Sequence, residues 1–587
     1  MDDQFSFRRA FAREQIYFRT ILIALLFIAF ILRLGAVSFG IPQSFYGDEL
    51  VSVVGGFKIL QSGSLWGNSF LYIPPLFSYI LAPFFGVAGV AGILLGWFSG
   101  VHEFQQYVLL HREEFLVIAR ILSALFGTAT VYILYLLGRN VFSKHVALLS
   151  AVFLVFDFLH VHETQTGRFW GPTAFFVVAG IYSIVKMKET RRLLWYVLAV
   201  FAIGFGYGMG YIILVLLPWF FWAHMHGWRG RRMRNLVMNT KEGAFFDKSF
   251  MVSLVLLCAI IVFFSLANPY AFQRQFGWLV AGVGSIFGFS FQHITTKPVG
   301  GGIHLWTNIL NVSRYFWSES PLFLLGAAGL IGWWRANNGK FFEFSLLLGM
   351  QLLYLAGLIF GFSRIEPRFI LPVVPPLLLG SSYAFFLGFS KQRTPFVRYL
   401  LLVFFTFGFF WYSVYPVYRY GALMSSFDTR TQAVEWIQKN VPLGSVIILD
   451  DYTVYVPMNK ESAAALKENN PVRFDTRAGA VLGISPDSRL YEPGYFVYDI
   501  SRFQDIDGEF KKIPAGYLFY SYWNARQKRE LEARYAGLDK VRVVGFAPRR
   551  DGKDAADILN DPMYPADALS GREFSGPYVE IYTFKNR

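Results

Sequence analysis

The sequence contains a single cysteine and few charged residues, and these shortages exclude several classes of protein. Cys258 has no second cysteine to pair with, so the chain forms no internal disulfide. Charged residues make up only 16% of the 587 residues, well below the share in a typical soluble protein. The long apolar runs are continuous rather than alternating, which excludes a transmembrane β-barrel. No internal repeat is visible, which disfavours a transporter built from two inverted halves.

Apolar and aromatic residues dominate instead. They make up 55% and 19% of the chain, and the mean hydropathy is +0.41. Apolar runs recur from Ile21 to about Pro416, and only helices satisfy the backbone of such runs in lipid. From about Gly421 onward the charge rises and turn residues return. The sequence predicts a polytopic α-helical membrane domain over residues 1–420 and a soluble α/β domain over residues 421–587.

The net charge of +15 would suggest a nucleic acid partner in a soluble protein. Here the basic residues fall mostly in loops between apolar runs. Arg8, Arg9, Arg13 and Arg19 precede the first run and place the N-terminus in the cytoplasm. That run is long for a signal peptide, and we interpret it as a retained anchor. The charge follows from membrane topology, and we expect no nucleic acid partner.

Eleven spans are predicted, with the N-terminus inside and the C-terminus outside. Residues 77–98 are apolar enough to cross, but a crossing there would place every later basic loop outside. We therefore expect this segment to re-enter the membrane or to lie at its surface. The spans whose limits the sequence defines lie at about residues 20–39, 115–137, 146–161, 172–185, 250–267, 342–362 and 399–415, with a tight pair within 193–223.

The loop after the first span delivers two adjacent carboxylates, Asp48 and Glu49, to the outer face. A carboxylate there can accept a proton from a hydroxyl, hold a cation or bind a sugar hydroxyl. A solvated acidic loop is the simpler interpretation of such a pair. The other acidic residues that this topology places outside are Glu163, Glu319 and Glu366.

Several arginines fall on the same outer face, where the positive-inside rule does not require them. A guanidinium at a helix end beside an acid can clamp a phosphate at headgroup depth, although a snorkelling anchor or a structural ion pair is the alternative. His293, in the long outer loop, is a further candidate for phosphate contact, or an ordinary interfacial histidine. The outer arginines are Arg168, Arg274, Arg314, Arg364 and Arg368.

The C-terminal domain shows alternating helix and strand patterns. Residues 428–440 have helical spacing, with Asp428 as a candidate N-cap, and residues 525–535 predict a second helix. No nucleophile motif or metal-ligand spacing is visible there, so binding or a lid role fits better than catalysis. Strands are predicted at residues 445–449, 495–500, 517–522, 541–546 and 579–584.

The order of several motifs resembles the GT-C glycosyltransferases, in the branch of protein O-mannosyltransferases and the lipid A aminoarabinose transferase. The early Asp48-Glu49 is followed by Pro74-Pro75-Leu76 and then by Ala119-Arg120-Ile121-Leu122-Ser123. An outer Gly167-Arg168-Phe169 follows the third span. Later come Arg368-Phe369-Ile370-Leu371-Pro372 and Asp428-Thr429-Arg430. The resemblance spans nearly the whole chain and rests on the order of the motifs.

The resemblance implies a polyprenyl-phosphate-linked sugar donor, used on the outer face of the membrane. We expect this membrane to be a bacterial or archaeal plasma membrane. It implies transfer to a lipid, glycan or protein acceptor with inversion of the anomeric centre. Asp48 matches the acid that activates the acceptor, and Glu49 matches its partner. Arg168 matches an arginine that this family often has in the second outer loop. The group Arg364, Glu366 and Arg368 matches positions where lipid-phosphate contacts are expected.

The sequence also departs from this family. An acid often follows the second-loop arginine, but residues 169–176 contain none, and whether Glu163 replaces it stays open. The oligosaccharyltransferase sequence Trp-Trp-Asp is absent, since Trp333-Trp334 is followed by Arg335. No cofactor is required by the chemistry, and a divalent metal ion bound by Asp48 and Glu163 is left open. A flippase for a lipid-linked sugar and a non-catalytic membrane scaffold are the alternatives from other classes.

Overall fold

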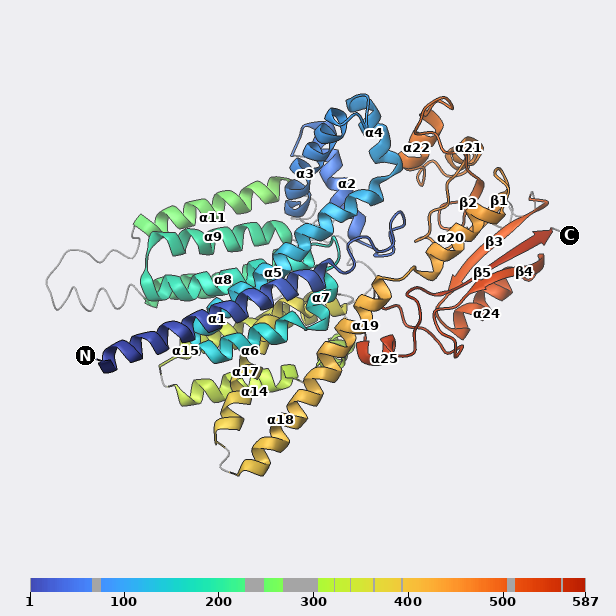
Figure 1. Cartoon of the computed structure of the whole chain (residues 1–587). Coiled ribbons are helices and arrows are strands. Elements are labelled where there is room, and N and C mark those ends of the chain that lie inside the picture. Colours follow the sequence, from blue (N-terminus) through green and yellow to red (C-terminus); the bar gives the residue numbers. More distant parts are fainter. Residues whose placement is uncertain are drawn as a thin grey trace, which may run out of the picture. The chain divides into compact units, whose positions relative to one another are not determined.

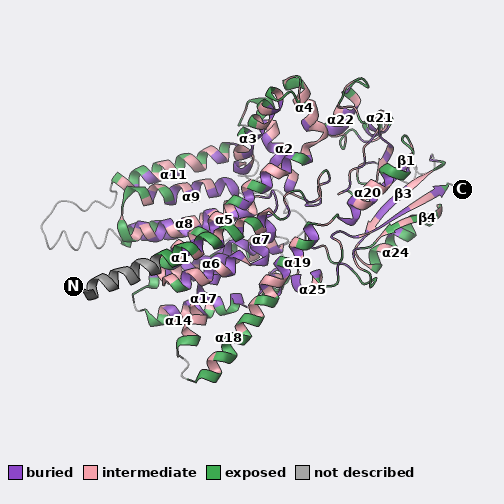
Figure 2. Cartoon of the chain, in the orientation of Figure 1, coloured by how far each residue is buried: buried purple, intermediate pink, exposed green. Residues whose placement is uncertain are grey.

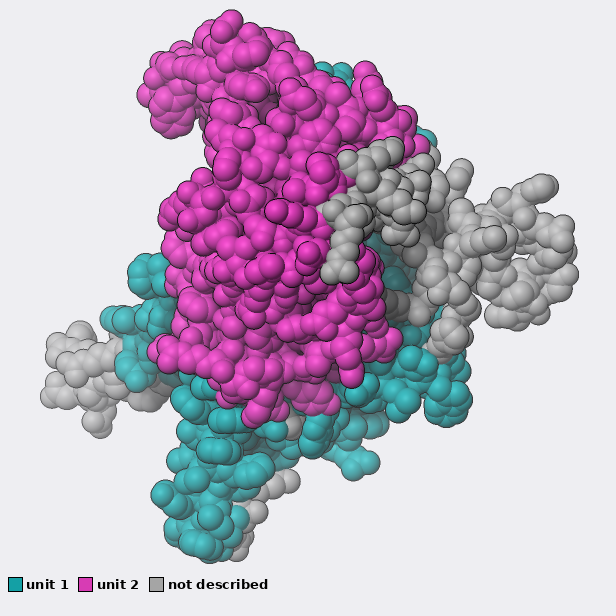
Figure 3. All heavy atoms as spheres, turned by 90° about the vertical axis from the view of Figure 1, so that its right-hand side faces the viewer, with its two compact units in different colours: residues 1–35, 55–80, 120–417 teal, residues 36–54, 81–119, 418–587 magenta. Residues whose placement is uncertain are grey.

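The computed structural model describes most of the chain, in two compact units that Figure 3 distinguishes by colour. Unit 1 contains residues 1–35, 55–80 and 120–417. Unit 2 contains residues 418–587 together with two earlier segments, 36–54 and 81–119. The described residues are 2–65, 75–226, 248–267, 305–320, 322–337, 339–362, 365–391, 394–503, 513–560 and 563–585.

Unit 1 is a bundle of long apolar helices, in which α8, α9 and α11 lie side by side (Figure 1). Its main helices are α1 (Asp2–Leu34), α5 (Leu116–Val141), α6 (Lys144–Val155), α7 (Phe158–Thr164), α8 (Trp170–Thr190), α9 (Leu193–Met209), α11 (Lys248–Ala267), α13 (Leu305–Glu319), α14 (Leu322–Ala336), α16 (Met350–Gly361), α17 (Val374–Lys391) and α18 (Pro395–Phe409).

The helices confirm the prediction of a polytopic membrane protein. Within the described residues, eight helices are long and apolar enough to cross a membrane, and a bent pair would make a ninth. Three shorter apolar helices, Leu193–Met209, Tyr211–His226 and Leu322–Ala336, come in addition. The segment α3 (Leu76–Leu94) is one of the eight. Its re-entrant course, and the direction in which each helix crosses, stay predictions.

The span predicted at residues 146–161 is not one continuous helix, because the helix breaks. α6 ends at Val155 and α7 starts at Phe158, with a bend of 60° between them. Asp157 supplies the cause: its carboxylate accepts a hydrogen bond from the backbone N–H of His160 at 2.9 Å and so caps a new helix. All seven residues of α7 are buried, as Figure 2 shows by colour.

Helices α14 and α17 approach one another through small residues. A Cβ atom added at Gly329 would lie 2.0 Å from the carbonyl oxygen of Gly380, so the two backbones touch. Ser381 donates a hydrogen bond across the pair to the carbonyl of Leu322 at 2.5 Å. Contact through glycine and serine is a common way for helices to associate in lipid, where no hydrophobic effect drives them together.

Unit 2 is built on a five-stranded mixed sheet in the order β2-β1-β3-β5-β4. β1 pairs in parallel with β2 and β3, whereas β5 pairs antiparallel with β3 and β4. β4 is an edge strand, and its register with β5 shifts between Arg542 and Val544. The strands are β1 (Val446–Asp450), β2 (Phe496–Asp499), β3 (Ala515–Tyr522), β4 (Asp539–Phe546) and β5 (Tyr578–Lys585).

The predicted strands and both predicted helices of this unit are confirmed. α20 (Thr429–Asn440) packs its Ala433 and Ile437 into the core and contacts β4 and β5, and Asp428 caps it as expected. α24 (Ala525–Arg534) packs on β3. Helices that the sequence analysis did not predict are α4 (Val101–Leu110), α21 (Lys460–Asn469), α22 (Thr476–Gly483) and α25 (Pro565–Leu569).

Replacing Gly576 with alanine should destabilise unit 2 by about 2–4 kcal/mol. Gly576 has φ +91°, and an added Cβ would lie 2.4 Å from both Asp428 Oδ1 and Thr429 Oγ1, the groups at the start of α20. Gly552 is the control: it has φ +66° and no atom within 4 Å of an added Cβ, so its alanine variant carries backbone strain alone, about 1–2 kcal/mol. Urea unfolding of the purified protein measures both, and equal losses would contradict the predicted clash.

Candidate active site

The loop before Asp48 is fixed by side chains that reach the rest of unit 2. The side-chain amide of Gln43 forms two hydrogen bonds with the backbone of Tyr455. Its Nε2 donates to the Tyr455 carbonyl oxygen at 2.8 Å, and its Oε1 accepts from the Tyr455 N–H. Gly47 donates its N–H to Asn560 Oδ1 at 3.1 Å, and Asn560 Nδ2 donates to the carbonyl of Phe45 at 3.2 Å. The backbone on the N-terminal side of Asp48 is therefore held in place.

Two buried aromatic rings add to this anchoring. The Tyr46 hydroxyl contacts the hydroxyl of Tyr420 and lies 3.6 Å from Met424 Sδ. The Phe45 ring lies 3.8 Å below the guanidinium carbon of Arg430, a cation–π contact in a buried setting. The chain therefore reaches Asp48 from a rigid platform, and Glu49 follows, fully buried, as the first residue of α2 (Glu49–Ser62).

Arg430 connects this platform to the start of α20. Its Nε and Nη2 donate to the two carboxylate oxygens of Asp428 at 2.8 and 3.0 Å, and its Nη1 donates to Thr453 Oγ1 at 2.8 Å. Burial alone would lower the pKa of Arg430, but the Asp428 carboxylate outweighs it and raises that pKa. Arg430 is therefore a permanent positive charge behind the Asp48 loop.

Asp48 itself is half-buried, in acidic surroundings. Partial burial raises the pKa of Tyr452, and the carboxylates of Asp557, Asp451 and Asp48 add to that rise. The charge of Asp48 thus acts on the same phenol as the charges of Asp451 and Asp557. A half-buried carboxylate that solvent can reach is able to take a proton from an incoming hydroxyl.

A second charged cluster lies in unit 1, around α7. Glu163 Oε1 is 3.0 Å from His162 Nδ1 and 3.5 Å from Arg168 Nη1, and all three side chains are at most 1% exposed. The sequence-predicted partners Glu163 and Arg168 are therefore brought together. Glu366 and Arg368 form a second ion pair at 2.5 Å, and the positive charge of Arg368 also acts on Glu163. Glu163, Arg168, Glu366 and Arg368 are therefore close to one another.

The break between α6 and α7 is fixed by Arg33, which lies inside the first apolar helix. Its guanidinium donates to the carbonyls of Ala29 and Leu154 at 2.9 and 3.2 Å and contacts His160 Nδ1 at 2.7 Å. The charge of Asp157 acts on Arg33 as well. A buried arginine in a membrane helix marks a functional or structural centre, and here it positions the start of α7.

Arg33 and Asp157 were missed by the sequence analysis, although a signal was present. Both are ionisable residues within apolar runs, and such residues rarely occur in lipid without a role. The contacts of Gln43, Phe45 and Asn560, in contrast, join parts of the chain about 400 to 500 residues apart. No local sequence pattern predicts such contacts.

The predicted residues fall into three groups. Asp48 and Glu49 belong to unit 2, whereas Glu163, Arg168, Glu366 and Arg368 belong to unit 1. His293 and Arg364 lie outside the described residues. The predicted roles of all these residues stay predictions.

The residues do not favour a metal ion at Glu163. In the described part of the chain, no group of three His, Cys, Asp or Glu side chains is arranged to hold a metal. Glu163 lies between Arg168 and His162, so a divalent cation there would meet positive charge. A metal ion shared by Asp48 and Glu163 stays an untested expectation, and no step of the chemistry below passes through one.

Replacing Glu319 with glutamine should stabilise the protein at neutral pH. Burial raises the pKa of Glu319, the last residue of α13, well above its usual value of 4.5, and the charges of Asp157 and Glu163 add to this rise. Because the folded state favours the protonated acid, the native protein loses stability as pH rises through the raised pKa. Melting temperatures of both proteins should coincide near pH 4 and diverge towards pH 8. Parallel curves would contradict the prediction.

One family model matches the middle of the chain. Residues 106–246 match the model described as dolichyl-phosphate-mannose-protein mannosyltransferase. This segment carries that family's sequence pattern. The predicted resemblance is confirmed here, and the mannosyltransferase-type segment contains both Glu163 and Arg168. A search of curated proteins finds no match.

Two solved membrane enzymes are distantly similar. AglB, the oligosaccharyltransferase of Archaeoglobus fulgidus in complex with an inhibitory peptide and a dolichol-phosphate, has a TM-score of 0.41 and 14% identity, over 80% of this chain and 69% of that chain. ArnT from Cupriavidus metallidurans bound to undecaprenyl phosphate has a TM-score of 0.43 and 11% identity, over 96% of this chain and 97% of that chain. Likeness at this distance carries no conclusion about activity.

Proposed function

We propose that the chain is an inverting glycosyltransferase, which moves a sugar from a polyprenyl-phosphate donor to an acceptor hydroxyl or phosphate at the extracytoplasmic face of a bacterial or archaeal plasma membrane. The observation that carries the proposal is the match of residues 106–246 to the mannosyltransferase family model. The matched segment holds the buried ion pair of Glu163 and Arg168, to which Arg368 is electrostatically coupled.

In this proposal the arginines bind the donor phosphate. A guanidinium carries five N–H donors in a planar fork, so Arg168 can contact Glu163 and a phosphate oxygen together. Arg368, paired with Glu366, supplies a second cation. As the bond between the sugar and the phosphate breaks, negative charge grows on the phosphate, and fixed cations stabilise that charge in a buried setting.

Asp48 acts as the base. The acceptor oxygen forms a bond to the anomeric carbon on the side opposite the lipid phosphate, the phosphate leaves with the electron pair of the old bond, and the acceptor proton passes to the Asp48 carboxylate. One displacement inverts the anomeric centre. The anchored backbone before Asp48 supports this role, because a base must be held within hydrogen-bond reach of the proton that it takes.

The test is sugar transfer by the purified full-length protein in detergent, with a panel of polyprenyl-phosphate sugars and measurement of carrier-phosphate release. Release from one donor supports the proposal and identifies the sugar. If donors bind but none is turned over, the protein is better described as a flippase for lipid-linked sugars. If no donor binds, the proposal fails.

A further inference from the structure

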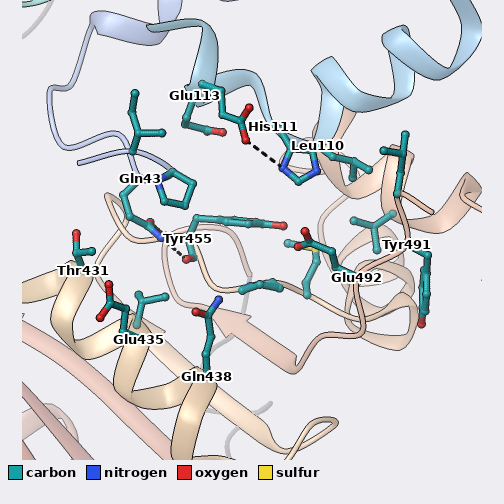
Figure 4. Close-up of a pocket in the computed structure, with 18 of the residues that line it drawn as sticks. Gln43, Leu110, His111, Glu113, Thr431, Glu435, Gln438, Tyr455, Tyr491 and Glu492 are labelled. Carbon is teal, nitrogen blue, oxygen red and sulfur yellow. Dashed lines mark hydrogen bonds and ion pairs between the residues drawn. The ribbon is translucent and has the colours of Figure 1, made fainter. Parts of the chain in front are cut away.

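Unit 2 contains a cavity of about 390 Å³ that the proposed reaction does not use (Figure 4). One wall comes from the loop that carries Asp48: Ile41, Pro42 and Gln43 line the cavity, and Gln43 lies five residues before Asp48. The other walls come from η1 (Arg112–Phe115), from α20 and from the segments around Tyr455 and Glu492. All the lining residues belong to unit 2.

The charge of this cavity is opposite to that of the chain. Glu113, Glu114, Glu435 and Glu492 line it, and among its described lining residues there is no lysine or arginine, although the chain carries a net charge of +15. Glu113 is neutralised by Arg477 and Arg112, and Glu114 contacts the hydroxyl of Tyr107.

Glu435 and Glu492 differ from these two acids. Within the described part of the chain, neither forms an ion pair. Figure 4 shows Glu435 on α20 and Glu492 on a facing loop, with the ring of Tyr455 between the walls. Burial raises the pKa of Tyr455, and the charge of Glu492 adds to that rise, so the phenol stays neutral. Two acids therefore remain for a cation that enters the cavity.

The rest of the lining is apolar. Leu110, Val434, Met458, Val481 and Ile484 supply aliphatic surface. A ligand that fits both parts has an aliphatic body and a cationic head. Lysine and arginine side chains have this form, since they bury their methylene stems and keep the charged end among polar groups.

We propose that this cavity binds a lysine or arginine side chain of a polypeptide acceptor, and so selects hydroxyl residues that lie near a basic residue. This proposal rests on the proposed transferase function and names its acceptor class. Gln43 connects the two sites. The loop that lines the cavity also carries Asp48, and the hydrogen bonds between Gln43 and Tyr455 hold this loop in place. A bound basic side chain thus places its neighbouring hydroxyl beside the base.

The test uses two fluorescent peptides and the full-length protein in detergent. Both peptides carry a serine and differ at one position, which is lysine in one and norleucine in the other. Norleucine keeps the aliphatic stem without the charge. By fluorescence anisotropy the lysine peptide should bind about fivefold to tenfold more tightly, as expected for two partly exposed ion pairs, and the difference should shrink with added salt.

The double variant Glu435→Gln with Glu492→Gln should remove the preference for lysine, whereas Glu468→Gln, at an exposed position on α21 outside the cavity, should keep it. Equal affinity for the two peptides in the native protein, or a preference that survives the double variant, would overturn the proposal. Carrier-phosphate release is measured separately. If the protein prefers the lysine peptide but releases carrier phosphate from no donor, the transferase function fails and the peptide site stands. If it releases carrier phosphate but shows no preference for lysine, the peptide site fails and the transferase function stands.

Discussion

Replacing Asp48 with asparagine should lower the rate of sugar transfer by about 10²–10⁴-fold, the range that a general base contributes. Asparagine keeps the shape of the side chain but cannot take the acceptor proton. Asp48 is half-buried, and the anchors of its loop are Gln43, Tyr46 and Asn560, none of which the change touches. The variant should therefore fold and bind the donor normally.

The measurement is carrier-phosphate release at saturating donor, with donor binding measured on the same sample. Asp539→Asn is the matched control, because Asp539 is an exposed residue at the start of β4. The control should turn over at the native rate. A native rate in Asp48→Asn would remove Asp48 from the mechanism, and lost donor binding together with lost rate would assign it to substrate binding instead.

Replacing Arg168 with glutamine should abolish donor binding and destabilise the protein by about 3–5 kcal/mol, because the change leaves the buried Glu163 without this cation. The two side chains are each 1% exposed and 3.5 Å apart. Arg168→Lys keeps the charge but loses the planar fork, so it should recover stability more fully than phosphate binding.

The double variant Arg168→Gln with Glu163→Gln separates structure from function. It removes both charges, so much of the lost stability should return, while donor binding stays absent. Melting temperature and binding of the lipid-phosphate donor are the two measurements. Arg335→Gln, at an exposed position on α14, is the control and should change stability by no more than about 0.5 kcal/mol. Normal donor binding by the double variant would place the phosphate elsewhere.

Local sequence patterns were sufficient to predict the strands of unit 2 and the start of one helix. The strands of unit 2 were predicted because each is a short run of β-branched or aromatic residues between turns, and Asp428 was recognised as a cap from its position before a helical repeat. The pairing order β2-β1-β3-β5-β4 was not predicted, because strand order is set by contacts distant in the sequence.

The direct contacts of the candidate site were easiest to predict where its residues lie close together in the chain. Glu163 and Arg168 are five residues apart, and both flank one helix end. The break at Asp157 was hidden because hydropathy averages over a window, and one acid among Val155, Phe156 and Phe158 hardly changes that average. The capping preference of aspartate was the signal that would have revealed it.

The exposed edge of the sheet has a consequence for how copies of this protein coexist on a crowded membrane. Among the described strands β4 pairs with β5 alone, and a strand side without a partner is the kind of surface on which neighbouring chains add strands and grow into aggregates. Its shifted register at Arg542 twists the edge, and the cationic Lys540 and Arg542 lie along it. Arg542 also pairs with Glu580 at 3.4 Å. We expect the twist and the basic side chains to disfavour strand addition by a neighbouring copy at this edge.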